Sequence, residues 1–137
     1  MESVSRTPEV NGKAPPLGLA CSGFKLVHYY ENAQIADVAN VTYLCLGGTW
    51  FRVYFEPETV FWRSDGAPPT SVNSDLTSGL LVNDLSEDRR VVGRELQRIE
   101  YEADNNRTFV VLYWSGGCVF RLEHSHVTEN TILRVGS

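Results

Sequence analysis

The residues best suited to chemistry are two histidines and the carboxylates beside them near the end of the chain. The run Glu123-His124-Ser125-His126 is followed closely by Glu129. Side chains alternate between the two faces of a β-strand, so a strand here would place His124 and His126 on one face. Two imidazoles and a carboxylate are a common ligand set for a divalent metal. The pattern predicts a metal site of His124, His126 and Glu129, in competition with two solvated histidines at a strand end.

The same run resembles the first metal-binding motif of the cupin family. Gly117 precedes the two histidines, Glu129 follows them, and Gly136 closes the run. The resemblance implies a small β-barrel metalloenzyme with a divalent cation on these side chains. The spacing departs from the cupin pattern, because Glu129 comes one residue early and the gap after Gly117 is one residue long. No second histidine-bearing motif follows, and the only other histidine is His28.

A second pattern lies in residues 49–56, which read as an amphipathic strand. Phe51, Val53 and Phe55 would share one face, and Trp50, Arg52 and Tyr54 the other. Tryptophan, tyrosine and arginine are enriched at protein-binding hot spots. With the phenylalanine face in the core, the second face predicts a protein-binding surface. The alternative is that the N-terminal leader or a long loop covers these aromatics. The expected binding residues are Trp50, Arg52, Tyr54, Trp62 and Arg121.

Gly48-Thr49-Trp50 is similar to the short G-x-W motif of lipocalins, in which the tryptophan closes the bottom of a ligand-holding barrel. The resemblance implies an interior pocket, which we expect Phe24, Phe51 and Phe120 to line. An eight-stranded barrel leaves room for one small ligand.

The chain lacks the local signatures of several enzyme classes. It has no glycine-rich phosphate loop, no G-x-S-x-G elbow, no H-E-x-x-H helix motif and no zinc-ribbon cysteines. We therefore assign no catalytic residue. The leading hypothesis is a non-catalytic protein-binding module of the adaptor, inhibitor or immunity type. The alternatives are a metal-binding, cupin-like β-barrel enzyme and a small-ligand-binding barrel.

The elements that position these residues are strands joined by tight turns. Gly47-Gly48 and Gly116-Gly117 each separate two β-favouring apolar runs, and such a pair predicts a hairpin because its turn needs positive φ. The fold class predicted is mainly β: an antiparallel barrel or a two-sheet sandwich of seven to nine short strands, with at most one or two short helices. Strands are expected over residues 24–30, 43–46, 49–56, 59–64, 80–85, 97–103, 107–114, 118–124 and 131–135.

Three segments are ambiguous or loop-like. Residues 31–39 would accommodate one or two helical turns. Residues 87–98 combine an acidic N-cap with apolar residues at helical spacing, but Gly93 weakens that helix by about 1 kcal/mol, so a strand competes. Residues 65–78 are rich in Pro, Ser, Asp and Thr and predict a long exposed loop. Residues 1–22 are expected to be a flexible leader or a tail draped over the domain of residues 23–137.

Composition limits the partners and the compartment. A net charge of −5 and a pI of about 5.1 disfavour nucleic acid and anionic membranes, which select basic surfaces. No apolar run approaches a membrane span, and no secretory signal precedes the domain. Cys21, Cys45 and Cys118 predict buried free thiols, with a Cys45–Cys118 disulfide as the alternative. We expect a cytoplasmic protein with a protein partner, and an oligomer through an unpaired edge strand remains open.

Overall fold

The chain folds into two β-sheets, which the computed structural model describes over residues 6–31, 34–64, 66–68, 78–84 and 92–136. These residues form ten strands and no helix. The strands are β1 (Glu9–Asn11), β2 (Cys21–Glu31), β3 (Gln34–Leu46), β4 (Thr49–Glu56), β5 (Thr59–Arg63), β6 (Ser78–Asp84), β7 (Leu96–Ala103), β8 (Arg107–Trp114), β9 (Val119–Ser125) and β10 (Asn130–Gly136). Nine lie in the expected domain, and β1 lies in the expected leader.

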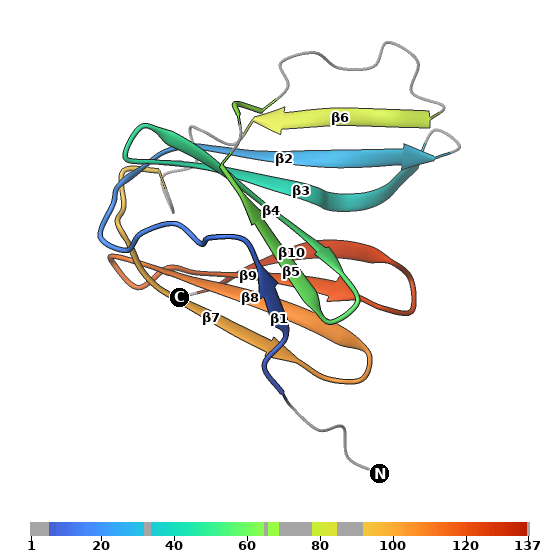
Figure 1. The fold of residues 1–137 in the computed structure, drawn as a ribbon. Helices are drawn as coiled ribbons and strands as arrows, with labels where there is room; N and C mark the ends of the chain where they lie inside the picture. Colours follow the sequence, from blue (N-terminus) through green and yellow to red (C-terminus); the bar gives the residue numbers. More distant parts are fainter. Residues whose placement is uncertain (1–5, 32–33, 65, 69–77, 85–91, 137) are drawn as a thin grey trace.

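The two sheets pack face to face as two layers (Figure 1). One has six strands in the order β1-β5-β4-β3-β2-β6, and the other has four in the order β10-β9-β8-β7. Their inner faces share one apolar core, in which the rings of Phe24 and Phe120 meet edge to face at 5.3 Å between centroids. Trp62 and Tyr101 join the layers through a hydrogen bond of 2.9 Å from Nε1 to Oη. The predicted sandwich is confirmed, and the predicted closed barrel is wrong, because the described sheets remain separate.

Both diglycine sequences form hairpin turns, as predicted. Gly47 and Gly48 have φ of 58° and 83° and connect Leu46 to its cross-strand partner Thr49. Positive φ at both central residues is the requirement of a turn that follows the strand twist. Gly116 and Gly117, with φ of 87° and 90°, lie in the connection between β8 and β9.

The described part of the expected leader lies along both sheets. β1 pairs in parallel with β5, the one parallel pairing among the described strands. Arg6 exchanges two backbone hydrogen bonds with Ala103 of β7, of 2.7 and 2.6 Å. Residues 6–22 are therefore a draped tail rather than a flexible leader, because strand edges need hydrogen-bond partners. The predicted boundary at residue 23 falls inside β2.

The helical alternatives are wrong where the structure describes them. Residues 34–39 belong to β3, and its pairing with β2 extends to Glu31 and Gln34 at the end of the hairpin. The backbone N–H and C=O groups of this segment therefore bond across the hairpin and are not available for helical turns. Residues 92–95 contain a turn with Gly93 at φ 89°, and β7 follows. Residues 87–91 and most of the predicted loop 65–78 lie outside the described residues.

The cysteines are buried free thiols, as predicted, and the alternative disulfide is not formed. Cys118 belongs to the core, whereas Cys45 lies opposite Trp50 on the outer side of the six-stranded sheet. Burial raises the pKa of Cys21 to about 11, so this thiol stays protonated. Within the described residues, no helix has the length and apolar character needed to cross a bilayer.

Candidate functional site

The outer face of the six-stranded sheet carries the predicted stripe of Trp50, Arg52 and Tyr54. Their strand neighbours Phe51 and Val53 are 8% and 0% exposed in the core. The three stripe residues alternate with them and are half-buried. The period-two pattern of this strand therefore orients the side chains as predicted, because one face of β4 packs on the opposite sheet.

Cross-strand register extends the stripe into ordered rows. Lys25, Tyr43, Arg52 and Arg63 are successive partners across β2, β3, β4 and β5, so three cations lie in one row. We call Lys25, Arg52 and Arg63 the cation row. Tyr54 lies opposite Phe61 in the row on one side, and Trp50 lies on the other side.

Each cation of the row lies next to an aromatic ring. Lys25 Nζ is 5.7 Å from the Trp50 ring, the Arg52 guanidinium is 5.3 Å from Tyr54, and the Arg63 guanidinium is 5.5 Å from Phe61. The rings of Tyr54 and Phe61 stack at 5.0 Å with 5° between their planes. We call the cation row together with Trp50, Tyr54 and Phe61 the aromatic–cationic face. Such contacts order long basic side chains on the sheet.

The structure removes Trp62 from the predicted surface and adds Phe61 and Arg63. Trp62 is 0% exposed and lies in the core opposite Val53. The turn between β4 and β5 contains two residues, since Glu56 pairs with Thr59. The expected strands 49–56 and 59–64 leave the same two-residue turn, and the register that follows from it pairs Val53 with Trp62 and so places Trp62 on the core face. The cross-strand register was therefore the signal that would have identified Phe61 and Arg63.

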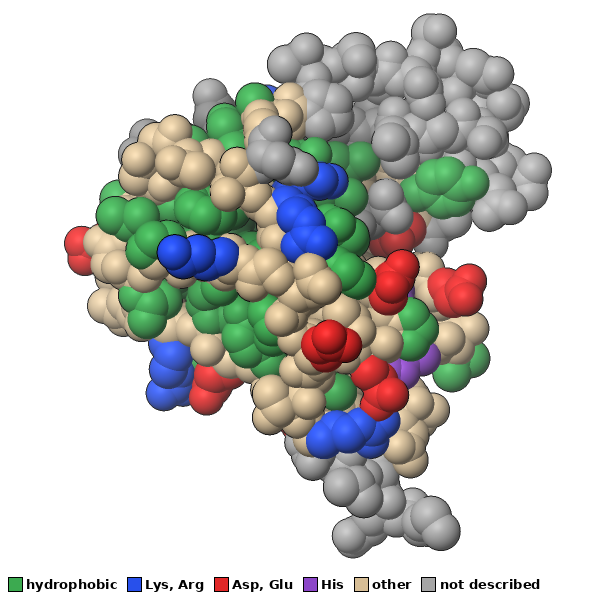
Figure 2. All heavy atoms as spheres, viewed as in Figure 1, with side chains coloured by type: hydrophobic (Ala, Val, Ile, Leu, Met, Phe, Trp, Pro, Cys, Tyr) green, Lys and Arg blue, Asp and Glu red, His purple; other side chains and the backbone are tan. Residues whose placement is uncertain are grey.

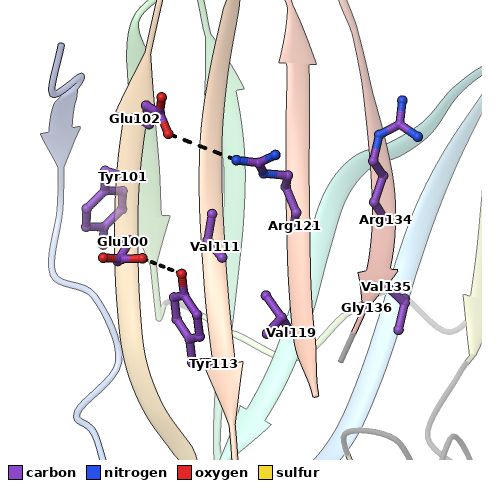
Figure 3. A pocket seen from close by; sticks show the side chains of 10 residues that line it. All are labelled: Glu100, Tyr101, Glu102, Val111, Tyr113, Val119, Arg121, Arg134, Val135 and Gly136. Carbon is purple, nitrogen blue, oxygen red and sulfur yellow. Dashed lines mark hydrogen bonds and ion pairs between the residues drawn. The ribbon is translucent and has the colours of Figure 1, made fainter. Parts of the chain in front are cut away.

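Arg121 lies on the opposite side of the molecule, on the outer face of the four-stranded sheet (Figure 3). It borders an open groove of about 740 Å³. Each of three arginines on this face pairs with a glutamate: Arg98 with Glu100 at 3.3 Å, Arg121 with Glu102 at 4.0 Å, and Arg134 with Glu123 at 3.1 Å. Arg121 therefore does not share a surface with Trp50, and its charge is offset within the sheet.

The two candidate metal-ligating histidines are turned towards threonine hydroxyls. His124 is 6% exposed, and its Nδ1 lies 2.9 Å from Thr131 Oγ1. His126 Nε2 lies 2.7 Å from Thr108 Oγ1, and the two imidazole centroids are 6.2 Å apart. Glu129 is exposed on the following turn at a φ of 55°. Among the described residues, no three His, Cys, Asp or Glu side chains converge as a metal ligand set, and His124, His126 and Glu129 are not brought together as one.

His124 instead faces a polar pocket at one end of the sandwich, which we call the end pocket. It has a volume of about 330 Å³. It is lined by Asp37, Phe55, Glu56, Pro57, His124, Glu129 and Thr131. The Phe55 ring stacks on the His124 ring at 5.5 Å with 2° between the planes. Figure 2 shows acidic side chains gathered beside the histidine atoms on the side where the β4–β5 and β9–β10 turns lie.

Burial controls the protonation of this pocket. It lowers the pKa of His124 to about 4, with the nearby His126 as a second cause, so the imidazole is neutral at pH 7. Burial also raises the pKa of Asp37, opposed by backbone N–H groups and by His28. Asp37 Oδ1 accepts hydrogen bonds from the amides of Thr131 at 2.9 Å and Ala39 at 3.3 Å. No local motif marked Asp37, because its partner Thr131 is 94 residues away in sequence.

The interior holds no ligand cavity where the lipocalin-like alternative places one. Phe24 and Phe120 are each 1% exposed and in ring contact, and Phe51 packs in the same cluster. The three side chains that should line the pocket instead fill the core.

Comparisons with protein-family models, curated proteins and solved structures find no match to this chain.

Proposed function

We propose that this protein is a non-catalytic binding module, of the adaptor, inhibitor or immunity type, that presents its aromatic–cationic face to an acidic protein in the cytoplasm. The observation that carries the proposal is the cation row flanked by Trp50 on one side and by Tyr54 and Phe61 on the other. Three buried free thiols agree with a reducing compartment.

The arrangement of charge on this face has a structural part and a part that supports binding. Arg52 and Arg63 are directly opposed on neighbouring strands, and like charges in such pairs destabilise a sheet by a few tenths of a kcal/mol up to about 1 kcal/mol. The chain as a whole carries a net charge of −5. The other sheet opposes Arg121 and Arg134 in the same way, with Glu102 and Glu123 beside them. Arg63 also donates hydrogen bonds to Asn11 and to the carbonyl of Trp62, which tie β1 to β5. A row of positive charge on a chain that is acidic overall supports the binding of an acidic partner.

The chemistry of the face selects the partner. Arginine forms bidentate, charge-assisted hydrogen bonds with carboxylates. Flanking rings exclude water from such contacts, as in the hot spots of protein interfaces. The side chains lie on β4 and on its paired neighbours in the sheet, so little order is lost on binding. A partner that presents Asp or Glu beside apolar side chains fits this surface.

The test is selection of binding peptides from a displayed random library, followed by affinity measurements on purified variants. We expect acidic peptides to be enriched. The double variant Trp50→Ala, Arg52→Ala should weaken their binding by about 30-fold or more, which corresponds to a hot-spot loss of about 2 kcal/mol. Binding should also weaken as salt is raised, because the charges are at the surface.

Arg121→Ala is the matched control, since it removes an arginine from the outer face of the other sheet. It should leave peptide affinity unchanged, and thermal unfolding should show that both variants are folded. Enrichment of peptides without acidic residues would contradict the proposal. So would equal affinity of the wild type and the double variant, or a loss confined to Arg121→Ala.

A further inference from the structure

Arg63 is held on the aromatic–cationic face by hydrogen bonds from both of its terminal nitrogens. Nη1 donates to the backbone carbonyl of Asn11 at 3.1 Å and to that of Trp62 at 2.7 Å. Nη2 donates to Oδ1 of Asn11 at 2.8 Å. The two oxygens of Asn11 therefore bind the end of the guanidinium together, from β1.

Gly12 makes room for this arrangement. A Cβ atom there would lie 2.1 Å from the carbonyl oxygen of Trp62 and 2.5 Å from Nη1 of Arg63. A side chain at this position would occupy the space that the guanidinium fills, and only glycine allows so close an approach. The end of β1 thus forms a seat for Arg63, which we call the Asn11–Gly12 seat.

The seat leaves one edge of the guanidinium for a ligand. An arginine side chain has five N–H donors, one on Nε and two on each Nη. Within the described part of the chain, Arg63 uses both hydrogens of Nη1 and one of Nη2. Nε–H and the second hydrogen of Nη2 lie side by side on the remaining edge. Such a pair of donors binds both oxygens of a carboxylate at once.

The surroundings fix this edge and add positive charge to it. Arg63 is half-buried, and its guanidinium lies 5.5 Å from the centre of the Phe61 ring. Its direct cross-strand partner is Arg52, and Lys25 completes the cation row. A side chain that is already ordered loses little entropy on binding, and the neighbouring cations attract an anion.

From these observations we propose that Arg63 is the carboxylate anchor of the aromatic–cationic face. Its Nε–H and Nη2–H edge binds one Asp or Glu side chain of the partner through two hydrogen bonds, and Asn11 is the residue that positions it. This inference rests on the proposed function and adds to it a defined donor pair and a positioning residue in β1. A row of three cations fits a segment with several acidic side chains better than a single chain terminus.

The experiment follows the Nε–H signal of Arg63 by NMR in the full ¹⁵N-labelled chain. Acetate replaces chloride at constant ionic strength, and acetamide is the uncharged probe of the same shape. Acetate should shift the Arg63 signal in a saturable way, because a carboxylate accepts hydrogen bonds from both donors of the edge. Acetamide should give no saturable shift. No shift at Arg63 when acetate replaces chloride, or an equal shift with acetamide, would overturn the proposal.

Variants test the positioning role of Asn11. Asn11→Ala removes the Oδ1 acceptor, so the guanidinium must be ordered when the ligand binds. Acetate binding at Arg63 should therefore weaken about threefold or more. Val10→Ala is the matched control, since it shortens an exposed side chain of the same strand. Thermal unfolding should show that both variants are folded. Wild-type acetate affinity in Asn11→Ala, or an equal loss in Val10→Ala, would overturn the role of Asn11.

Peptides identify the source of the carboxylate. A glutamate-rich peptide with an amidated C-terminus should shift the Arg63 signal more than its glutamine counterpart with a free C-terminus. An equal or larger shift with the second peptide would overturn the assignment to acidic side chains.

The outcomes also separate this inference from the proposed function. Acetate bound at Arg63 without enrichment of acidic peptides would contradict the proposed function alone. Arg63→Lys keeps the positive charge but lacks the paired donors. Acidic peptides that bind equally to the wild type and to Arg63→Lys would overturn this inference alone.

Discussion

At the scale of single residues, the most informative side chain is His124, which is 6% exposed and, among the described residues, bonds to Thr131 rather than to a carboxylate. Its ring stacks on Phe55 and bonds to a threonine hydroxyl, neither of which favours the protonated form. The same burial makes this residue a source of acid sensitivity for the whole fold.

We predict that the free energy of unfolding decreases as the pH is lowered, because His124 takes up a proton more readily in the unfolded chain. Its pKa is 6.5 in the unfolded chain and about 4 in the fold, so between these values only the unfolded chain takes up the proton. The free energy of unfolding should therefore decrease as pH falls from 6.5 towards 4, by a total of about 3 kcal/mol. Asp37 opposes this trend in acid, because its raised pKa favours protonation of the folded state. His124→Gln should flatten the decrease, as measured by urea unfolding between pH 7 and about pH 5.

The control for this prediction is His126→Gln. Burial is the larger cause of the lowered His124 pKa and His126 the smaller one, so this variant should keep most of the pH dependence. An NMR titration of the imidazole protons assigns the effect directly. A His124 that titrates with an unshifted pKa, or a His124→Gln variant with the wild-type slope, would contradict the assignment.

At the scale of elements, the short strand β1 depends on the backbone next to it. Gly12 follows β1 with φ of 94°, and a Cβ atom there would overlap the carbonyl oxygen of Trp62. Gly18 has a similar φ of 89°, but nothing lies within 4 Å of its Cβ position. Both glycines need positive φ, but only Gly12 also needs the space next to Trp62. A comparison of the two therefore separates the effect of the close contact between β1 and β5 from the effect of positive φ.

We predict that Gly12→Ala is clearly more destabilising than Gly18→Ala. Gly18→Ala should lower the free energy of unfolding by about 1 kcal/mol through positive φ alone. Gly12→Ala should add the clash with Trp62 and lower it by about 3 kcal/mol or more. Urea unfolding monitored by tryptophan fluorescence measures both. Equal losses in the two variants would show that β1 does not approach β5 as closely as described.

At the scale of the whole molecule, the N-terminal segment links the two sheets along one side (Figure 1). Besides its bonds to Ala103, it donates from Glu9 N to Glu58 O at 3.0 Å and from Gly18 N to Leu96 O at 2.7 Å. Arg6 also forms an ion pair with Glu58. One segment therefore occupies backbone groups of both β5 and β7, which would otherwise be available to a second chain.

We predict that deleting residues 1–19 destabilises the protein and makes it self-associate. The lost backbone hydrogen bonds contribute about 1 kcal/mol each, so the free energy of unfolding should fall by several kcal/mol. The uncovered edges should add strands from another copy, which sedimentation would detect as a concentration-dependent increase in mass. Deletion of residues 1–5 alone keeps the bonds described above and is the control. A monomeric, fully stable chain after the longer deletion would contradict this role.

The sequence by itself determined the local architecture, because turns and strand faces depend on neighbouring residues. The diglycine pairs specify hairpins through positive φ, and the period of two along residues 49–56 orients Trp50, Arg52 and Tyr54 outward. Only the tertiary structure decided which faces meet. The register of β4 and β5 put Trp62 opposite the core residue Val53, and the division into two sheets put Arg121 on the far side. Asp37 accepts a hydrogen bond from the amide of Thr131, which is 94 residues away in sequence. No local sequence pattern predicts this contact, because it depends on which distant strands come together in the fold.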